Sequence, residues 1–226
     1  MALSPGSSRA VRYACSVLAD CGTRVLPADP FDLACRAGIS LLPLSAAREH
    51  PLFAGTDAVS ALRMACAVTL SYPAFCIVYR DGDTDPDRLR FALFHELGHL
   101  FMNHYRDDPG LFGSLRPGSS AVEAEADAFA LNLMAPVPVV DVIRYNQPGK
   151  ARASLFGMSR SAWMRRLDTM DRDRAFLDEA SAGLILFLFK DYLLGRRCSA
   201  CGQSFVDEQQ ENRCPFCGAP NPEWTL

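Results

Sequence analysis

The spacing of apolar residues along the chain predicts a mainly helical fold with a few short strands. Apolar positions recur at intervals of three and four residues over most of the sequence, which is typical of helices with one buried face. Asp29-Pro30 and Asp85-Pro86 mark two helix starts, because the carboxylate can cap free N–H groups and proline fits the first turn. The expected helices cover residues 9–19, 27–38, 86–104, 121–134, 160–170 and 176–194, with a short helix ending at Phe156, and the expected strands cover residues 39–44 and 74–79.

The helix expected over residues 86–104 is apolar on more than one side. Leu89, Leu93 and Leu97 lie on one face, and phenylalanines lie on the others. We therefore expect a central, nearly buried helix. Glycine and proline are frequent in residues 107–120, which predicts a loop after it.

Composition and charge narrow the possible classes of protein. Of 226 residues, 49% are hydrophobic and 22% are charged, which is enough apolar material for one main domain with a buried core and a small appendage. The net charge of -3 argues against a wholly basic surface that would bind nucleic acid.

The sequence lacks the patterns that are typical of export or membrane insertion. The first residues have no apolar stretch like that of a signal peptide, and residues 1–8 are typical of a disordered leader. The longest apolar run, residues 183–189, falls far short of the roughly 20 residues that cross a bilayer and predicts a buried helix instead. We expect a cytoplasmic protein without a membrane segment.

The central helix carries the motif His95-Glu96-Leu97-Gly98-His99. Residues four apart share a helix face, so the two imidazoles can converge on one metal ion, and zinc commonly binds histidine nitrogen. Glu96 then lies beside the ion, where its carboxylate can take a proton from water and later deliver it to a leaving amine. Gly98 leaves room for close packing or for a substrate. Two unrelated histidines are the alternative, but they would leave buried polar groups without partners.

A third ligand is expected from the helix over residues 121–134, which contains Glu123, Glu125 and Asp127. Glu123 and Asp127 are four residues apart and share a face, whereas Glu125 points to another side. We expect Glu123 to bind the metal and Asp127 to orient a ligand histidine through its second ring nitrogen. Glu125 is the alternative ligand, and otherwise we expect it to face solvent.

Three blocks follow one another along the chain: Arg90-Phe-Ala-Leu-Phe-His-Glu-Leu-Gly-His-Leu100, then Glu123-Ala-Glu-Ala-Asp-Ala-Phe-Ala130 with Leu133-Met-Ala-Pro136, then Leu155-Phe-Gly-Met-Ser-Arg160 leading to Arg166-Leu167. In these blocks the sequence resembles the ImmA/IrrE-type metallo-endopeptidases, over roughly residues 9–175. The family pattern of Glu, three residues, then Asp or Asn supports Glu123 over Glu125 as the ligand. The chain departs from the family at Ala135, where a bulkier arrangement before proline is common, and in its C-terminal segment.

The resemblance implies an α+β protein with a mostly helical, zincin-like metalloprotease core and a small sheet. It also implies a zinc-dependent, site-specific endopeptidase that cleaves a helix-turn-helix repressor and so induces stress, phage or mobile-element genes. The spacing of the motifs does not itself indicate a repressor substrate. The rival hypothesis is a zinc-stabilised regulatory or DNA-binding protein whose protease-like site is silent.

Four of the nine cysteines form a spaced set near the end of the chain. Cys198-x-x-Cys201 and Cys214-x-x-Cys217 are separated by 12 residues, which is typical of a four-thiolate zinc ribbon. We expect this second zinc to be structural, and disulfides are the alternative. The other five cysteines lack ligand spacing and suit a reducing compartment. The acidic loop between the two pairs favours a protein partner over nucleic acid.

The region before the ribbon resembles a helix-turn-helix at residues 155–167. Arg160, Arg165 and Arg166 could contact phosphate, but aspartates follow at once, so packing on the core is favoured and direct nucleic-acid binding is not expected. The expected parts are a disordered leader at residues 1–8, a metallopeptidase domain at 9–145, a helical region at 146–195 and a zinc ribbon at 196–226.

The group that would stabilise a tetrahedral oxyanion is not identifiable from the sequence. His104, Tyr105 and Tyr145 are candidates. His104 lies five residues after His99 and off the ligand face, so a structural role is favoured. The strand at residues 74–79 could pair with an extended substrate or could be an ordinary internal strand.

Overall fold

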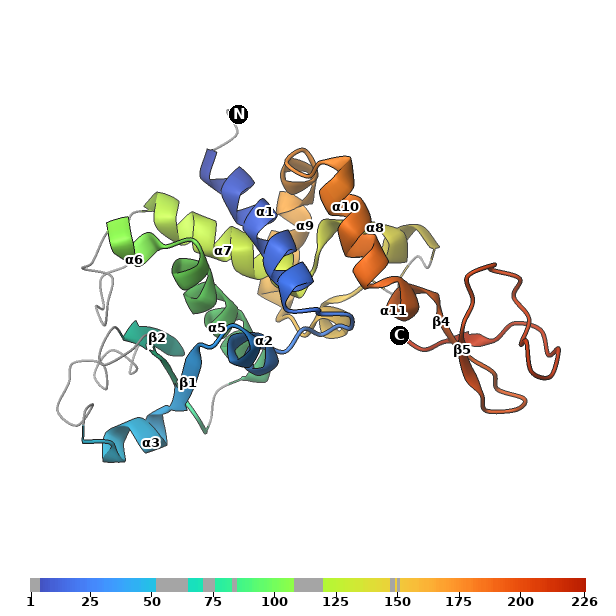
Figure 1. Ribbon diagram of the computed structural model, residues 1–226, viewed down its shortest axis with the longest axis horizontal. Coiled ribbons are helices and arrows are strands. Elements are labelled where there is room, and N and C mark those ends of the chain that lie inside the picture. The colour runs from blue at the N-terminus through green and yellow to red at the C-terminus, as the bar shows by residue number, and fades with distance from the viewer. Residues whose placement is uncertain are drawn as a thin grey trace.

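Two helices that lie against each other, α5 (Pro86–Phe101) and α7 (Ser120–Met134), form the centre of the protein (Figure 1). The computed structural model describes residues 5–51, 65–70, 76–82, 85–107, 120–146, 149 and 151–226. Helix α1 (Pro5–Asp20) packs along α7, and buried apolar side chains from all three helices form the main core. Two small sheets accompany the helices, so the α+β class is confirmed.

The other helices of the described residues surround this centre. The predicted N-caps are confirmed, because the carboxylate of Asp29 accepts from the backbone N–H of Phe31 and that of Asp85 accepts from Asp87 and Arg88. These helices are α2 (Pro30–Arg36), α3 (Leu44–Glu49), α6 (His104–Asp107), α8 (Val137–Asn146), the 3-10 helix η2 (Ala153–Phe156), α9 (Arg160–Arg174), α10 (Glu179–Leu188) and α11 (Lys190–Leu194).

A three-stranded sheet lies against α5. Its order is β1 (Ser40–Pro43), β3 (Cys76–Tyr79), β2 (Ala67–Leu70), with β1 parallel and β2 antiparallel to β3. Of the two alternatives given for the strand at residues 74–79, the internal strand is confirmed, because β3 has a neighbour on each side and has no free edge for a substrate. In the described part of this sheet, β2 pairs with β3 alone.

The second sheet lies at the other end of the molecule, beyond α11 (Figure 1). It is antiparallel in the order β5 (Ser204–Val206), β4 (Gly195–Arg197), β6 (Glu223–Trp224). The guanidinium carbon of Arg196 on β4 lies 4.1 Å from the centre of the Trp224 ring on β6, and this cation–π contact adds to the pairing of the two strands.

Two helix ends differ from the predicted pattern. Helix α5 ends at Phe101 rather than near residue 104, because Asn103 adopts a left-handed conformation, with φ of 60°, and turns the chain. The helix predicted over residues 176–194 is divided at Phe189 into α10 and α11.

Two further helices depart from expectation at their starts. Helix α1 begins at Pro5, inside the segment that was expected to be a disordered leader. Helix α8 lies outside the helices expected from the sequence, because prolines such as Pro136 and Pro138 usually end a helix. Pro138 instead lies in the first turn of α8, where its missing N–H is not needed. The loop predicted at residues 107–120 lies almost entirely outside the described residues.

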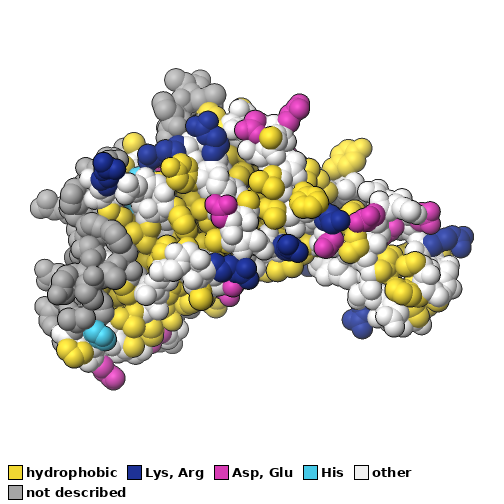
Figure 2. Space-filling view, viewed as in Figure 1, with side chains coloured by type: hydrophobic (Ala, Val, Ile, Leu, Met, Phe, Trp, Pro, Cys, Tyr) yellow, Lys and Arg dark blue, Asp and Glu magenta, His cyan; other side chains and the backbone are white. Residues whose placement is uncertain are grey.

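The apolar run at residues 183–189 is only partly buried, which corrects the prediction of a buried helix. Ile185 and Phe189 point into the core, whereas Leu184 and Phe187 are 44% and 68% exposed. Figure 2 shows apolar side chains gathered over α10. No single helix among the described residues has the length and apolarity to cross a membrane, although α7 and α8, joined at a 45° bend, pass that test as a pair.

Gly98 permits the close approach of the two central helices. A Cβ atom at this position would lie 3.0 Å from Cδ1 and 3.3 Å from Cβ of Phe129 on α7. Gly183 in α10 differs, because a Cβ atom there would meet nothing within 4 Å.

This contrast predicts opposite effects on stability at the two glycines. Gly183→Ala should raise the free energy of unfolding by about 0.5–1 kcal/mol, because alanine restricts the unfolded chain without a clash. Gly98→Val should lower the free energy of unfolding by about 1–3 kcal/mol, because the added side chain overpacks the contact and pushes α5 away from α7. Urea unfolding of both variants measures the difference, and equal effects at the two glycines would contradict it.

A buried arginine on α9 forms an ion pair within that helix and hydrogen bonds to the end of α7. The Arg166 guanidinium is fully buried and donates to Asp173 at 2.6 Å, to the side-chain oxygen of Asn132 at 3.0 Å and to the carbonyl of Ala135 at 2.8 Å. Asp173 also accepts from Arg172. Arg166 is therefore unable to contact phosphate, which corrects its place among the candidate basic residues.

Loss of this ion pair should be costly. Arg166→Met leaves the buried Asp173 carboxylate without one of its two cations and should lower the free energy of unfolding by about 3 kcal/mol or more. Arg174→Met on the same helix breaks an exposed pair with Asp141 and should cost about 0–1 kcal/mol. Chemical denaturation should show a lower stability for Arg166→Met than for Arg174→Met. Equal stability of the two variants would refute the stabilising role given to the buried Arg166–Asp173 pair.

Candidate metal centre

Helices α5 and α7 bring two histidines and one glutamate to a common point. His95 and His99 lie one turn apart on α5, and Glu123 reaches them from the first turn of α7. The Nε2 atoms of the two histidines are 3.0 Å apart. Glu123 Oε2 lies 3.1 Å from His95 Nε2 and 3.8 Å from His99 Nε2. Three atoms that can each bind a metal ion, two imidazole nitrogens and one carboxylate oxygen, therefore face one another.

These donors fit a divalent metal ion. Two ligands of a tetrahedral zinc ion, each bound at about 2.0–2.1 Å, lie roughly 3.3 Å apart, which is close to the separations found here. Two imidazole nitrogens and one carboxylate oxygen form a donor set that zinc accepts at catalytic sites. His95, His99 and Glu123 could thus hold a metal ion.

Asp127 lies behind His95 rather than at the cluster itself. The Nδ1–H of His95 donates to Asp127 Oδ1 at 2.9 Å, and the other Asp127 oxygen accepts from Arg165 at 2.8 Å. Burial lowers the pKa of His95, but its hydrogen bonds to Asp127 and Glu123 outweigh burial and raise that pKa to about 10. Metal binding at Nε2 therefore requires release of the proton that lies between His95 and Glu123.

Two hydroxyl groups hold the carboxylate of Glu96. Thr69 on β2 donates to Glu96 Oε2 at 2.6 Å, and Tyr105 on α6 donates to the same atom at 3.2 Å. Burial, followed by the negative charge of Glu96, raises the pKa of Tyr105 far above its usual range, so the phenol remains a donor. The side chain of Glu96 is thereby fixed between the sheet and α6.

Glu125 does not join the three converging donors, and the expectation that it faces solvent otherwise is wrong. Only 7% of the residue is exposed, and its carboxylate accepts two hydrogen bonds from Arg9 on α1, at 3.0 and 2.7 Å. It also accepts from His104 Nε2 at 3.0 Å. His104 Nδ1 lies 2.9 Å from Nδ1 of His99. Burial lowers the pKa of His104, although Glu125 partly opposes this shift.

The three candidates for stabilising an oxyanion differ in their exposure and contacts. His104 is 2% exposed and uses both ring nitrogens in contacts, and Tyr145 is 86% exposed. Tyr105 alone among them contacts Glu96.

Sequence reasoning missed the parts of Arg9 and Thr69 in this site. Arg9 is 116 positions from Glu125, and Thr69 is 27 positions from Glu96. Neither residue belongs to a motif. The sequence indicates Arg165 only as a possible phosphate contact. In the structure it donates to Asp127, and its guanidinium lies 4.7 Å from the centre of the Phe91 ring.

The four C-terminal cysteines also lie together. Sγ of Cys198 is 3.6 Å from that of Cys217, and Sγ of Cys201 is 3.6 Å from that of Cys214. Disulfide sulfurs lie about 2.05 Å apart, so these cysteines form no disulfide with one another. Thiolates bound to one tetrahedral zinc ion lie roughly 3.8 Å apart, which is close to the separations found here. The backbone N–H of Cys201 lowers the pKa of Cys198 to about 7. This cluster could hold a second ion.

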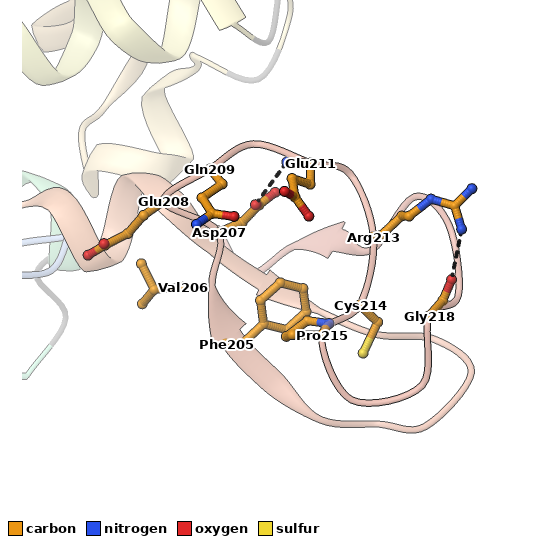
Figure 3. Close-up of a pocket in the computed structure, with 10 residues that line it drawn as sticks. All are labelled: Phe205, Val206, Asp207, Glu208, Gln209, Glu211, Arg213, Cys214, Pro215 and Gly218. Carbon is orange, nitrogen blue, oxygen red and sulfur yellow. Dashed lines mark hydrogen bonds between the residues drawn. The ribbon is translucent and has the colours of Figure 1, made fainter.

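A cleft of about 570 Å³ opens beside the cysteine cluster (Figure 3). Cys214 lies on its wall, and Asp207, Glu208 and Glu211 make one side acidic. The backbone N–H of Glu211 donates to Asp207, while Arg213 reaches toward the carbonyl of Gly218. The acidic loop noted in the sequence thus borders a cleft.

The two clusters predict two divalent ions per chain. His95→Ala should remove one ion and leave the cysteine cluster loaded, and Cys201→Ser should remove the other ion. Elemental analysis after dialysis against a weak chelator measures the stoichiometry of each variant. Retention of two ions by His95→Ala would contradict the placement of the first site.

The family model described as Peptidase_M78, the IrrE N-terminal-like domain, matches residues 63–168. No curated protein and no solved structure matches the chain significantly. The matched segment contains β2, α5, α7 and the His95 cluster, and it continues past residue 145 into α9. The match supports a metallopeptidase-like function. Residues 63–168 of this chain are therefore similar to the IrrE N-terminal-like domain.

Proposed function

We propose that the protein is a zinc-dependent endopeptidase that cleaves a specific protein substrate. The observation that carries this proposal is the convergence of His95, His99 and Glu123, with Glu96 fixed on the next position of the same helix. The family match supports the same class of reaction.

The chemistry follows from the positions of these groups. A bound zinc ion would polarise the scissile carbonyl and make water acidic enough to act as a nucleophile near neutral pH. Glu96 takes the proton from the attacking water and later delivers it to the leaving amine. Thr69 and Tyr105 both donate to one Glu96 oxygen, so they orient the carboxylate. Tyr105 keeps its proton and is our candidate donor to the developing oxyanion, a role in which its single O–H would turn from Glu96 to the substrate.

The proposed substrate is a helix-turn-helix transcriptional repressor, whose cleavage would release silenced genes. This part of the proposal comes from the resemblance to ImmA/IrrE-type proteins and from no contact in the site. Among the described strands, β2 is our candidate to pair with an extended substrate segment, because its Thr69 contacts Glu96 and β3 lies between two strands. We place the reaction in the cytoplasm on the same resemblance.

The cysteine cluster has a separate part in the proposal. Four thiolates would leave a zinc ion no open position, so the second ion would stabilise the C-terminal sheet and perform no chemistry. We propose that the acidic cleft beside it serves a protein contact or regulation.

The decisive variant is Glu96→Gln. The amide keeps the shape of the side chain but is unable to accept a proton, so cleavage should fall by about 10²–10⁴-fold while both ions stay bound. The assay incubates the protein with the repressor encoded beside its gene and follows fragments by mass spectrometry. Arg174→Met, which breaks an exposed ion pair outside the site, is the control and should cleave at the wild-type rate.

Two results would count against the proposal. Cleavage that persists at the same rate in Glu96→Gln would refute the part assigned to this carboxylate. Binding of the repressor without cleavage by the fully loaded wild-type protein would favour the silent regulatory alternative.

A further inference from the structure

A chain of hydrogen bonds, buried from His99 as far as Glu125, connects His99 to the N-terminal helix. His99, His104 and Glu125 are 4%, 2% and 7% exposed. The contacts run from His99 Nδ1 to His104 Nδ1 at 2.9 Å, from His104 Nε2 to Glu125 Oε2 at 3.0 Å, and from both Glu125 oxygens to Arg9. Four helices, α5, α6, α7 and α1, each supply one member.

The direction of each hydrogen bond follows from the chemistry of its members. A guanidinium only donates, and the ionised carboxylate of Glu125 only accepts. His104 must therefore donate its Nε2–H to Glu125. A neutral imidazole carries one N–H, so His104 Nδ1 is left as an acceptor. His99 must then donate its Nδ1–H to that atom.

The consequence falls on the other nitrogen of His99. With its proton on Nδ1, neutral His99 carries a free lone pair on Nε2. That nitrogen lies 3.0 Å from His95 Nε2 and 3.8 Å from Glu123 Oε2, so it is the atom that faces the candidate metal site. A proton on this nitrogen would exclude the metal.

We propose that His104 is a positioning residue which, together with Glu125 and Arg9, fixes His99 in the tautomer whose Nε2 can bind a metal ion. The proposal rests on the metal site of the proposed function. His104 does for His99 what Asp127 does directly for His95, and an imidazole bridges the longer path from His99 to a carboxylate on α7.

The break after α5 makes this arrangement possible. Continuation of α5 would carry residue 104 off the face of His99. Asn103, in its left-handed conformation, instead turns the chain so that the imidazole of His104 returns to His99. The next residue, Tyr105, reaches Glu96 from the same short helix. Helix α6 thus supports both a candidate ligand and the candidate base.

The test compares two replacements of His104 in the full-length protein. Gln can donate to Glu125 and accept from His99, as the imidazole does, whereas Phe fills similar space without polar atoms. Zinc affinity at the His95 site should fall by about 10- to 100-fold in His104→Phe and should be largely retained in His104→Gln. Competition with a chelator measures it, and the cysteine site should keep its affinity in both variants.

A second readout is independent of metal affinity and of peptidase activity. Imidazole nitrogen chemical shifts in the wild-type protein, with and without zinc at this site, should show the proton of His99 on Nδ1 in both forms. Glu125→Gln adds an amide that can donate to His104, so it should reduce the population of this tautomer in the same measurement.

Three outcomes would overturn the inference. A wild-type protein with the His99 proton on Nε2 overturns it even if the variants do not fold. Equal zinc affinity in wild type and His104→Phe, or equal loss in His104→Gln and His104→Phe, also overturns it. Failure to cleave a repressor, with this tautomer and zinc affinity intact, would count against the proposed function alone.

Discussion

The close packing of α5 on α7 determines where the three candidate metal ligands lie. Gly98 allows the Phe129 ring to sit against the backbone of α5, and this contact sets the spacing between the two helices. Histidines on one helix and a glutamate on the other can then approach within hydrogen-bonding distance. A wider spacing would leave each side chain in place on its own helix and still separate the donors.

Three acidic residues at alternate positions of α7 point in different directions, and each requires its own positive or proton-donating partners. Glu123 faces the two histidines, Asp127 lies between His95 and Arg165, and Glu125 meets Arg9 and His104. Of the three, Glu125 is buried, and a buried carboxylate without such partners is strongly unfavourable. Helices α1 and α9 therefore supply charges that the central pair needs, in addition to apolar surface.

Local patterns predicted much of this structure. The N-caps Asp29 and Asp85, the α+β class and the four cysteines on one module follow from short segments, because caps and helical spacing act over a few residues. The ligand roles of the motif residues remain predictions, although the structure brings His95 and His99 together with Glu123.

Contacts between distant segments were beyond the reach of sequence patterns. The apolar pattern of α5 continues through residue 101, and nothing nearby indicates that Asn103 reverses the chain and returns His104 to the site. The position of β3 inside its sheet, which excludes it from substrate pairing, depends on segments that lie far away in the sequence. The pairing of Arg9 with Glu125 also has a consequence for any minimal catalytic fragment. A fragment cut to residues 63–168 would contain all three candidate metal donors, yet it would leave a buried carboxylate without its guanidinium.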